Sequence, residues 1–171
     1  CNFSYVYNNQ LKENNMSINE KIFFDSGRNI LKKYFFDYSV DLNVVWNKIY
    51  KKELFFISEK IFFPKGKYYE DNFTVYKLYN KAKKVILLNE VLYYYVKRED
   101  AITSKFTLKH LNDSLEYIKD YYIYSNNKDN DIKNIMQIAA LKQYLNLYKI
   151  RNLNNKMFNL LKLERTFILE K

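Results

Sequence analysis

The only proline of this chain, Pro64, stands close to one of its two glycines, Gly66, just before a pair of adjacent carboxylates, Glu70 and Asp71. Proline fixes φ and glycine tolerates left-handed backbone, so this segment predicts a tight turn. An aromatic-rich pattern with helical spacing follows, which places the carboxylates at or near a helix start. The helix dipole favours an ionised carboxylate there. An ionised carboxylate held at a fixed point can act as a general base.

The two carboxylates are consecutive, so on a helix they point about 100° apart and do not face each other. We therefore expect them to have separate roles if both take part in a reaction. Simple decoration of a helix start is the alternative explanation, and the pair by itself does not exclude it.

Length and composition indicate one globular domain with a substantial core. The chain has 171 residues, of which 48% are hydrophobic, and this argues against disorder. The formal net charge of +10 suits an anionic partner, namely a nucleotide diphosphate, a nucleic acid or an acidic membrane face. Because the lysines are spread along the chain, a solvated lysine-rich surface is the alternative.

Cysteine usage and hydropathy favour a cytoplasmic protein. Cys1 is the only cysteine, so no intrachain disulfide can form and a reducing compartment is the simplest match. No apolar run approaches the roughly 20 residues needed to span a bilayer. The strand-like start lacks an initiator methionine and a basic signal-peptide region, so we expect a fragment of a longer protein.

The first 105 residues combine short strand patterns with helical ones, which predicts an α+β fold. We expect a strand over 2–7 and two short strands over 85–88 and 91–96 that are joined by a turn at 89–90. Residues 22–24 are a second short apolar run, and residues 44–46 are β-prone. We expect helices over 26–38, 51–56 and from Glu70 or Asp71 to about Ala82. The polar segment 8–19 is expected to form turns.

Residues 106–171 are expected to form an all-helical tail, with a turn cluster at 125–131. Three apolar stripes support this prediction: Leu108, Leu111, Leu115, Ile118 and Tyr122; Ile132, Ile135, Ile138, Leu141, Leu145 and Tyr148; and a weaker one of Met157, Leu160, Leu161 and Ile168. The stripes predict a helical hairpin packed on the first part. A stripe left uncovered would indicate a surface for a partner.

Metal and phosphate-loop chemistry have little support in the sequence. His110 is the only histidine, so no zinc spacing exists, and we expect it at the surface or at a helix start. The D-N-D sequence at 129–131 has a spacing that can chelate a divalent cation, but it precedes a predicted helix and capping explains it. Gly27 and Gly66 stand alone, so there is no glycine-rich phosphate loop.

Four short motifs occur in order along the first part of the chain. They are W-N-K-I-Y at 46–50, F-P-K-G-K-Y-Y-E-D at 63–71, A-K-K-V at 82–85 and L-Y-Y-Y-V-K-R at 92–98. Together they resemble the second half of a family 2 glycosyltransferase of the bacterial surface-polysaccharide type. The family pattern runs W-N-K-L-Y, F-P-x-G-x-x-x-E-D, A-K-K-V and P-L-Y-x-Y-x-x-R. The resemblance covers about residues 1–105.

The resemblance implies a GT-A type fold. Residues 1–105 would be the acceptor-side part of the catalytic domain, and residues 106–171 a helical C-terminal extension. It also implies inverting transfer of a hexose from a nucleotide sugar to a glycan or lipid-linked acceptor. A divalent metal, Mg or Mn, would be held mostly by an upstream D-x-D, in a nucleotide-binding half that this sequence lacks.

The resemblance also assigns roles to the site residues. Asp71 is expected to take the proton of the acceptor hydroxyl, with Glu70 orienting the loop or the acceptor. Trp46 and Asn47 are expected at the acceptor, where the indole would offer an apolar face to a sugar ring unless it belongs to the core.

Lys48 and Arg98 are the candidates for contact with the anionic diphosphate. The family often has a serine shortly after this arginine, whereas Ala101 stands here, with Thr103 or Ser104 as substitutes. The fragment is expected to be inactive by itself. The whole enzyme is expected in the cytoplasm, with association to the inner membrane face as a further expectation.

Two other classes of function fit parts of the sequence. A non-catalytic interaction domain would use the helical tail to dock a partner or the inner membrane face. A nucleic-acid-binding module would combine the positive charge with aromatic rings that stack on bases. No RNA- or DNA-binding motif is present, so a nucleic-acid partner is not expected.

Overall fold

Segment Pro64–Phe73, which contains the predicted turn and helix start, groups with the C-terminal helices instead of with its neighbours in sequence. The computed structural model describes residues 2–7, 10–13, 22–36, 42–56, 58–98, 101–102, 105–150 and 153–169. One compact unit comprises residues 1–63 and 74–104, and the other comprises residues 64–73 and 105–171. The change of pattern near residue 105 thus coincides with one of the three points where the chain passes between units.

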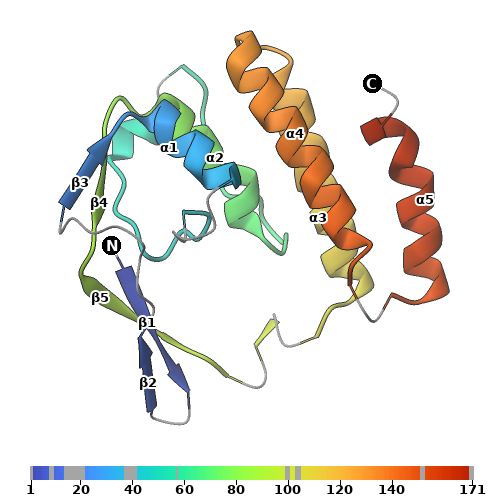
Figure 1. Cartoon of the computed structure of the whole chain (residues 1–171), viewed down its shortest axis with the longest axis horizontal. Coiled ribbons are helices and arrows are strands. Elements are labelled where there is room, and N and C mark those ends of the chain that lie inside the picture. Colours follow the sequence, from blue (N-terminus) through green and yellow to red (C-terminus); the bar gives the residue numbers. More distant parts are fainter. Residues whose placement is uncertain are drawn as a thin grey trace. The chain divides into compact units, whose positions relative to one another are not determined.

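The strands of the first unit form two small sheets (Figure 1). In one sheet β1 (Asn2–Tyr7) lies between β2 (Gln10–Glu13) and β5 (Val91–Val96), antiparallel to β2 and parallel to β5. In the other, β3 (Ile22–Asp25) pairs antiparallel with β4 (Val85–Leu88), with Phe23 opposite Leu87. β4 and β5, although consecutive in the chain, therefore belong to different sheets.

The predicted strands are present, but the pairing of 85–88 and 91–96 and the structure of two other segments differ from expectation. The strands at 85–88 and 91–96 are confirmed, yet β4 pairs with β3 and β5 pairs with β1. Residues 10–13, predicted as turn, form β2, because pairing with β1 compensates for their polar sequence. Residues 44–46, predicted as β-prone, lie in bends and turns, where Trp46 packs through its ring instead of a strand ladder.

The helices of the first unit join an aromatic core. Helix α1 (Gly27–Phe36), a 3-10 turn η1 (Lys52–Phe55) and helix α2 (Glu70–Lys81) match the predicted helices closely. Tyr34 and Phe35 of α1 meet Tyr79 and Tyr76 of α2, with ring centroids 6.0 and 6.4 Å apart. Helix α2 begins in the second unit at Glu70 and continues through the first.

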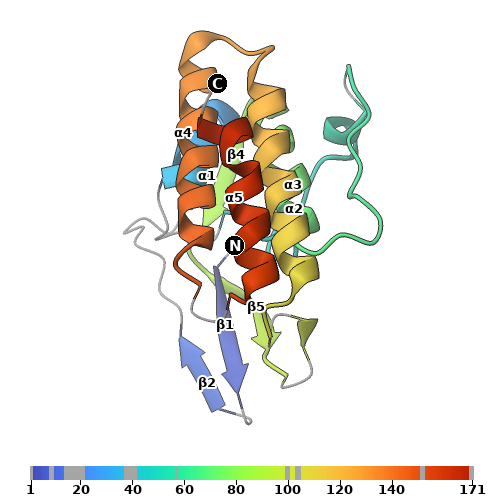
Figure 2. The same ribbon diagram turned by 90° about the vertical axis from the view of Figure 1, so that its right-hand side faces the viewer.

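The second unit is built on three helices: α3 (Leu108–Ser125), α4 (Asn130–Leu147) and α5 (Asn155–Leu169). Helices α3 and α4 pack along each other, and α5 contacts both of them (Figures 1 and 2). The Tyr144 hydroxyl of α4 donates a hydrogen bond to the Leu161 carbonyl of α5. Burial, followed by the hydrogen bond with Tyr148, raises the pKa of Tyr144, so its phenol stays a neutral donor.

The buried face of α4 differs from the predicted stripe. Ile138 and Leu145 are 56% and 47% exposed, whereas the buried positions are Ile132, Met136, Ala139, Ala140, Tyr144 and Leu147. From Ile132 to Leu141 the predicted stripe advanced three residues at a time, and each such step falls about 60° short of a full turn. The true face alternates steps of three and four, as a period of 3.6 requires.

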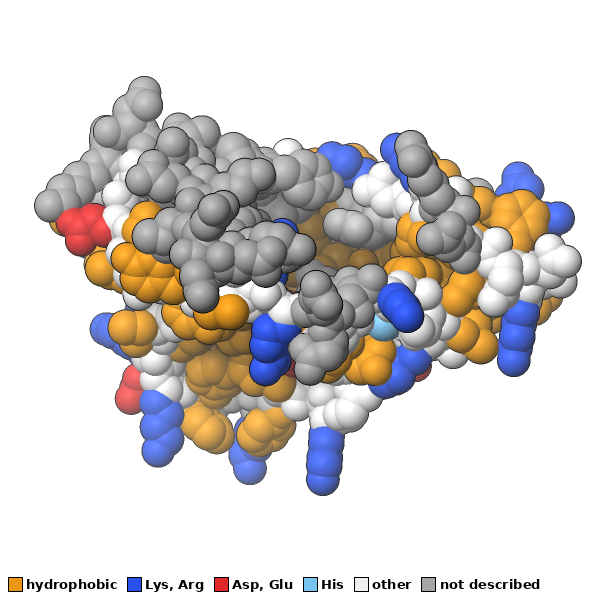
Figure 3. All heavy atoms as spheres, turned by 90° about the horizontal axis from the view of Figure 1, so that it is seen from below, with side chains coloured by type: hydrophobic (Ala, Val, Ile, Leu, Met, Phe, Trp, Pro, Cys, Tyr) orange, Lys and Arg blue, Asp and Glu red, His pale blue; other side chains and the backbone are white. Residues whose placement is uncertain are grey.

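On the face that Figure 3 presents, the positive charge of the described residues is not collected on one patch. Figure 3 shows lysine and arginine side chains spread singly between hydrophobic ones on the face that it presents. Several ammonium groups of the described residues lie over the protein's own rings, among them Lys33 over Phe23 at 4.2 Å and Lys84 over Phe24 at 4.4 Å. Within the described part of the chain, no helix combines the length and apolarity that crossing a membrane would require.

Candidate site: a fixed carboxylate pair and an aromatic platform

The residues that the sequence singles out fall into two groups, one in each unit. The second unit holds Glu70 and Asp71, and the first holds Trp46, Asn47, Lys48 and Arg98. The two groups are described in turn, beginning with the carboxylate pair, because hydrogen bonds and ring packing fix the turn that precedes it.

Glu70 and Asp71 form the first turn of α2, as predicted. Both side chains are half-buried. The Asn72 amide donates to Asp71 Oδ1 and to the Tyr69 carbonyl oxygen, each over 2.9 Å. The positive end of the helix dipole and the amides of the first turn attract negative charge here.

Two residues of the preceding turn have left-handed backbone. Gly66 has φ +75°, which glycine adopts without steric cost. Tyr69 has φ +59°, where its Cβ costs about 1–2 kcal/mol. The Tyr69 ring meets those of His110 and Tyr117 of α3, with centroids 5.8 and 6.3 Å apart. A strained residue held by packing therefore stands directly before the carboxylate pair.

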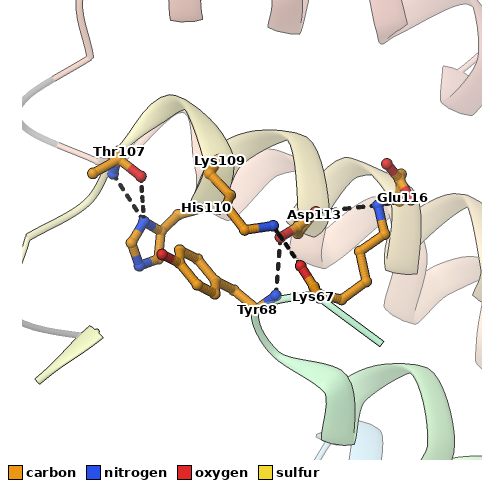
Figure 4. A network of polar contacts seen from close by, with 8 residues as sticks. Lys67, Tyr68, Thr107, Lys109, His110, Asp113 and Glu116 are labelled. Atoms are coloured by element: carbon orange, nitrogen blue, oxygen red, sulfur yellow. Dashed lines mark hydrogen bonds and ion pairs between the residues drawn. The ribbon is translucent and has the colours of Figure 1, made fainter. Parts of the chain in front are cut away.

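A buried carboxylate of α3, Asp113, holds this turn (Figure 4). It is 3% exposed, and its Oδ2 accepts hydrogen bonds from the Tyr68 amide over 2.9 Å and from Lys109 Nζ over 2.7 Å. Lys67 Nζ lies 3.3 Å from Oδ1. Burial by itself would raise the pKa of this carboxyl, but the bonds from Lys109, Tyr68 and Lys67 outweigh burial and lower it.

Two lysines extend the network to either side of Asp113. Lys109 Nζ also donates to the Gly66 carbonyl over 2.8 Å and lies 4.6 Å from the centre of the Tyr68 ring. Lys67 Nζ forms an ion pair with Glu116 at 2.6 Å, and this contact leads the causes that raise the lysine's pKa. The turn is thus bound to α3 through its backbone as well as through its side chains.

His110 occupies the third position of α3, so the predicted helix start is confirmed and the predicted surface position is wrong. The side chain is 3% exposed because its ring packs on Tyr68, with ring centroids 4.5 Å apart. Its Nδ1 accepts the Thr107 amide over 3.0 Å and lies 2.7 Å from Thr107 Oγ1. Since an amide can only donate, this nitrogen is the unprotonated one, and the pair forms a capping box.

Trp46 lies flat on two tyrosines of β5 in the first unit. Its ring is 4.7 Å from Tyr93 at 28° and 5.0 Å from Tyr95 at 30°, measured between centroids and ring planes. Tyr93 and Tyr95 are two residues apart, so they share one face of the strand. The indole is half-buried, with the protein's own rings on one side.

The polar residues that follow Trp46 in sequence make hydrogen bonds within the protein. Asn47 is 6% exposed, and Lys48 Nζ donates to Asn47 Oδ1 and to the Val44 carbonyl. Arg98 is exposed two residues after β5, and its carbonyl accepts the Ala101 amide over 3.3 Å. The suggested substitutes Thr103 and Ser104 lie outside the described residues.

The D-N-D sequence at 129–131 acts as a helix cap, as predicted. Asp129 is the N-cap of α4, and its Oδ1 accepts the Ile132 amide over 3.2 Å. In the part of the chain that the structure describes, no group of three His, Cys, Asp or Glu side chains is placed to hold a metal ion.

Sequence reasoning missed the residues that fix the turn, Asp113 above all. The signal was a second stripe on α3, formed by His110, Asp113 or Ser114, Tyr117 and Tyr121, all buried beside the apolar one. A helix buried on two faces shows such a double stripe. The prediction from sequence considered only the apolar stripe, although a polar side chain such as a carboxylate can be buried where suitable donors lie nearby.

Neither protein-family models nor curated proteins match this sequence. The grounds for a function are therefore the four ordered motifs and the fixed carboxylate pair at the start of α2.

Proposed function

We propose that this chain is the acceptor-side, C-terminal portion of an inverting, nucleotide-sugar-dependent glycosyltransferase that transfers a hexose to a glycan or lipid-linked acceptor. The observation that carries the proposal is the place of Glu70 and Asp71. They end the F-P-x-G-x-x-x-E-D motif and begin α2, directly after a turn bound to buried Asp113. A carboxylate held in this way suits a general base, because proton transfer requires a base in a defined position.

In the proposed reaction Asp71 takes the proton of the acceptor hydroxyl while that oxygen attacks the anomeric carbon. The bond from that carbon to the nucleotide diphosphate breaks, and the configuration inverts. Glu70, which points away from Asp71 by about 100° on the helix, orients the acceptor or the loop. General-base catalysis of this kind contributes roughly 10²- to 10⁴-fold to the rate.

The leaving diphosphate needs positive charge. Arg98, exposed after β5, is the better suited of the two candidate anion contacts, because Lys48 already donates to carbonyl oxygens of its own chain. A divalent ion, Mg or Mn, belongs to the proposal for the whole enzyme, with its ligands in a nucleotide-binding half outside this sequence. The proposed enzyme works in the cytoplasm, at the inner membrane face.

The test is sugar transfer by the longer protein that contains this chain, supplied with a panel of nucleotide sugars and assayed by release of nucleoside diphosphate. We expect Asp71→Asn to lower turnover by roughly 10²-fold or more while donor binding is unchanged. Glu70→Gln is the matched control, one residue away with the same charge change, and should have a smaller effect on turnover. Normal turnover of Asp71→Asn would refute the base assignment, and lack of binding to any nucleotide sugar would refute the enzyme class.

Docking to an anionic membrane face is a second candidate, favoured by the exposed stripe on α4. Ile138 and Leu145 are seven residues apart and lie on one side of the helix, with half-buried Lys142 between them. Apolar and basic side chains together suit an anionic lipid surface. Vesicles containing phosphatidylserine should co-sediment the chain at low salt, and the Ile138→Asp, Leu145→Asp double variant should stay in solution. Equal sedimentation of both proteins would exclude this role.

A further inference from the structure

The contacts between segment 64–73 and α3 converge on one carboxylate. Asp113 receives the Tyr68 amide and the ammonium groups of Lys67 and Lys109 (Figure 4). Removing a carboxylate from water is costly unless donors replace the water. These three donors do so, and two of them come from the turn itself.

Of the three donors, the Tyr68 amide restricts the backbone conformation of the turn most. Long lysine side chains can reach a carboxylate from many backbone conformations, whereas a backbone amide reaches it from few. The 2.9 Å bond from Tyr68 to Asp113 therefore selects one conformation of the turn. Lys109 reinforces that choice, since it joins Asp113 to the Gly66 carbonyl.

The selected conformation includes the strained residue. Tyr69 follows the bonded amide of Tyr68 and precedes Glu70, and its φ of +59° sets the direction in which the chain enters α2. Left-handed backbone at a non-glycine residue persists only where its surroundings enforce it. The bond from Tyr68 to Asp113 and the ring contacts of Tyr69 with His110 and Tyr117 supply that enforcement.

We propose that Asp113 is a positioning residue for the carboxylate pair: through the Tyr68 amide it fixes the turn that aims Glu70 and Asp71. It acts on the reaction through the backbone and does not touch the substrate. Its meaning for catalysis rests on the proposed function, whereas its hold on the turn is a property of the chain that can be measured without any substrate.

Hydrogen exchange of the Tyr68 and Tyr69 amides tests the hold on the turn. We expect Asp113→Ala to speed this exchange about tenfold or more, while peptides of α4 and α5 exchange as in the wild type. Asp113→Asn, which keeps an acceptor for the Tyr68 amide, should have a smaller effect. Glu116→Ala is the control. It removes another carboxylate of α3 that pairs with Lys67, but it leaves the hydrogen bond from the Tyr68 amide to Asp113 intact.

Unchanged exchange at Tyr68 in both Asp113 variants would overturn the proposal. If Asp113→Ala unfolds the whole unit, the test rests on Asp113→Asn and Lys109→Met. Each variant weakens the network but leaves the Tyr68 amide with a hydrogen-bond acceptor. The proposal requires faster exchange confined to 64–73 in at least one of these two variants, and wild-type exchange in both overturns it.

Kinetics of the longer protein separate this proposal from the proposed function. A positioning role predicts a lower kcat for Asp113→Asn with an unchanged donor KM, and a near-normal kcat for Glu116→Ala. If the wild type transfers sugar and Asp113→Ala loosens the turn without loss of kcat, positioning is refuted and the enzyme stands. If the wild type transfers no sugar, the proposed function is refuted, and so is the catalytic role of Asp113. Hydrogen exchange alone then decides whether Asp113 holds the turn.

Discussion

The backbone amide of Gly27 donates a hydrogen bond to the carbonyl oxygen of Ala82 over 3.1 Å, joining the start of α1 to the end of α2. A Cβ at Gly27 would lie 2.1 Å from the Tyr79 carbonyl oxygen and 2.2 Å from that of Ala82. Both oxygens belong to the backbone of α2 and the residue that follows it, so neither can rotate away. The two helices can approach this closely because residue 27 has no side chain.

Gly27→Ala should therefore lower the free energy of unfolding by at least about 2 kcal/mol, since the backbone must separate to admit a methyl group. Gly66→Ala is the matched control. Its Cβ would meet no atom within 4 Å, and the penalty of about 1–2 kcal/mol comes from its positive φ. Urea denaturation measures both values. A cost for Gly27→Ala no larger than that for Gly66→Ala would contradict the steric explanation.

His110→Ala should destabilise the second unit by about 2 kcal/mol, because it removes both the acceptor for the Thr107 amide and a buried ring against Tyr68. His110→Gln should recover part of this loss, since glutamine at the third helical position can complete the same capping box. Thermal unfolding followed by circular dichroism gives the comparison. Equal melting temperatures for the two variants would show that the cap contributes nothing.

Protonation of Asp113 at acid pH should lower the free energy of unfolding. Its folded-state pKa is lowered below the ordinary value of 3.8, so its stabilising effect is fully present above about pH 4 and is lost as the pH falls through the folded-state value. The difference in unfolding free energy between wild type and Asp113→Asn should be constant from pH 7 to pH 5 and shrink below pH 4. Urea titrations across this range supply the measurement, and a difference that grows in acid would reverse the assigned sign.

Trp46 is the only tryptophan, so its fluorescence reports on the first unit. Tyr95→Ala should shift the emission maximum to longer wavelength, because water replaces one of the two rings that cover the indole. Tyr94→Ala is the control, since Tyr94 points to the opposite face of β5 and is 57% exposed. An equal shift in both variants would mean that the tyrosine stack does not shield Trp46.

The elements that depend on neighbouring residues were predictable from sequence. Pro64 and Gly66 set a turn, and α2 begins at Glu70 as that turn requires. The cap at Asp129 likewise needs only the amide of Ile132 three residues on. Such local structure can be predicted from sequence because the residues that form it lie within a few positions of one another.

What escaped prediction depends on residues far apart in sequence. The polar segment 10–13 is a strand because β1 pairs with it, and the phase of α4 is set by the helices against it. Asp113 reads as a solvated charge until the Tyr68 amide, 45 positions away, is brought to it. The carboxylate pair was thus visible in the sequence, whereas the residue that holds its turn was not.

The parallel pairing of β1 with β5 also orders events during synthesis. Tyr5 and Tyr95 are register partners 90 positions apart, and closing so long a loop costs about 4 kcal/mol of chain entropy. The ribosome needs roughly 5–20 s to make the residues between them. Through that interval β1 can pair with β2 but keeps its other edge open, and an open edge invites pairing with a wrong strand. The arrival of β5 is therefore the step that closes the second edge of β1.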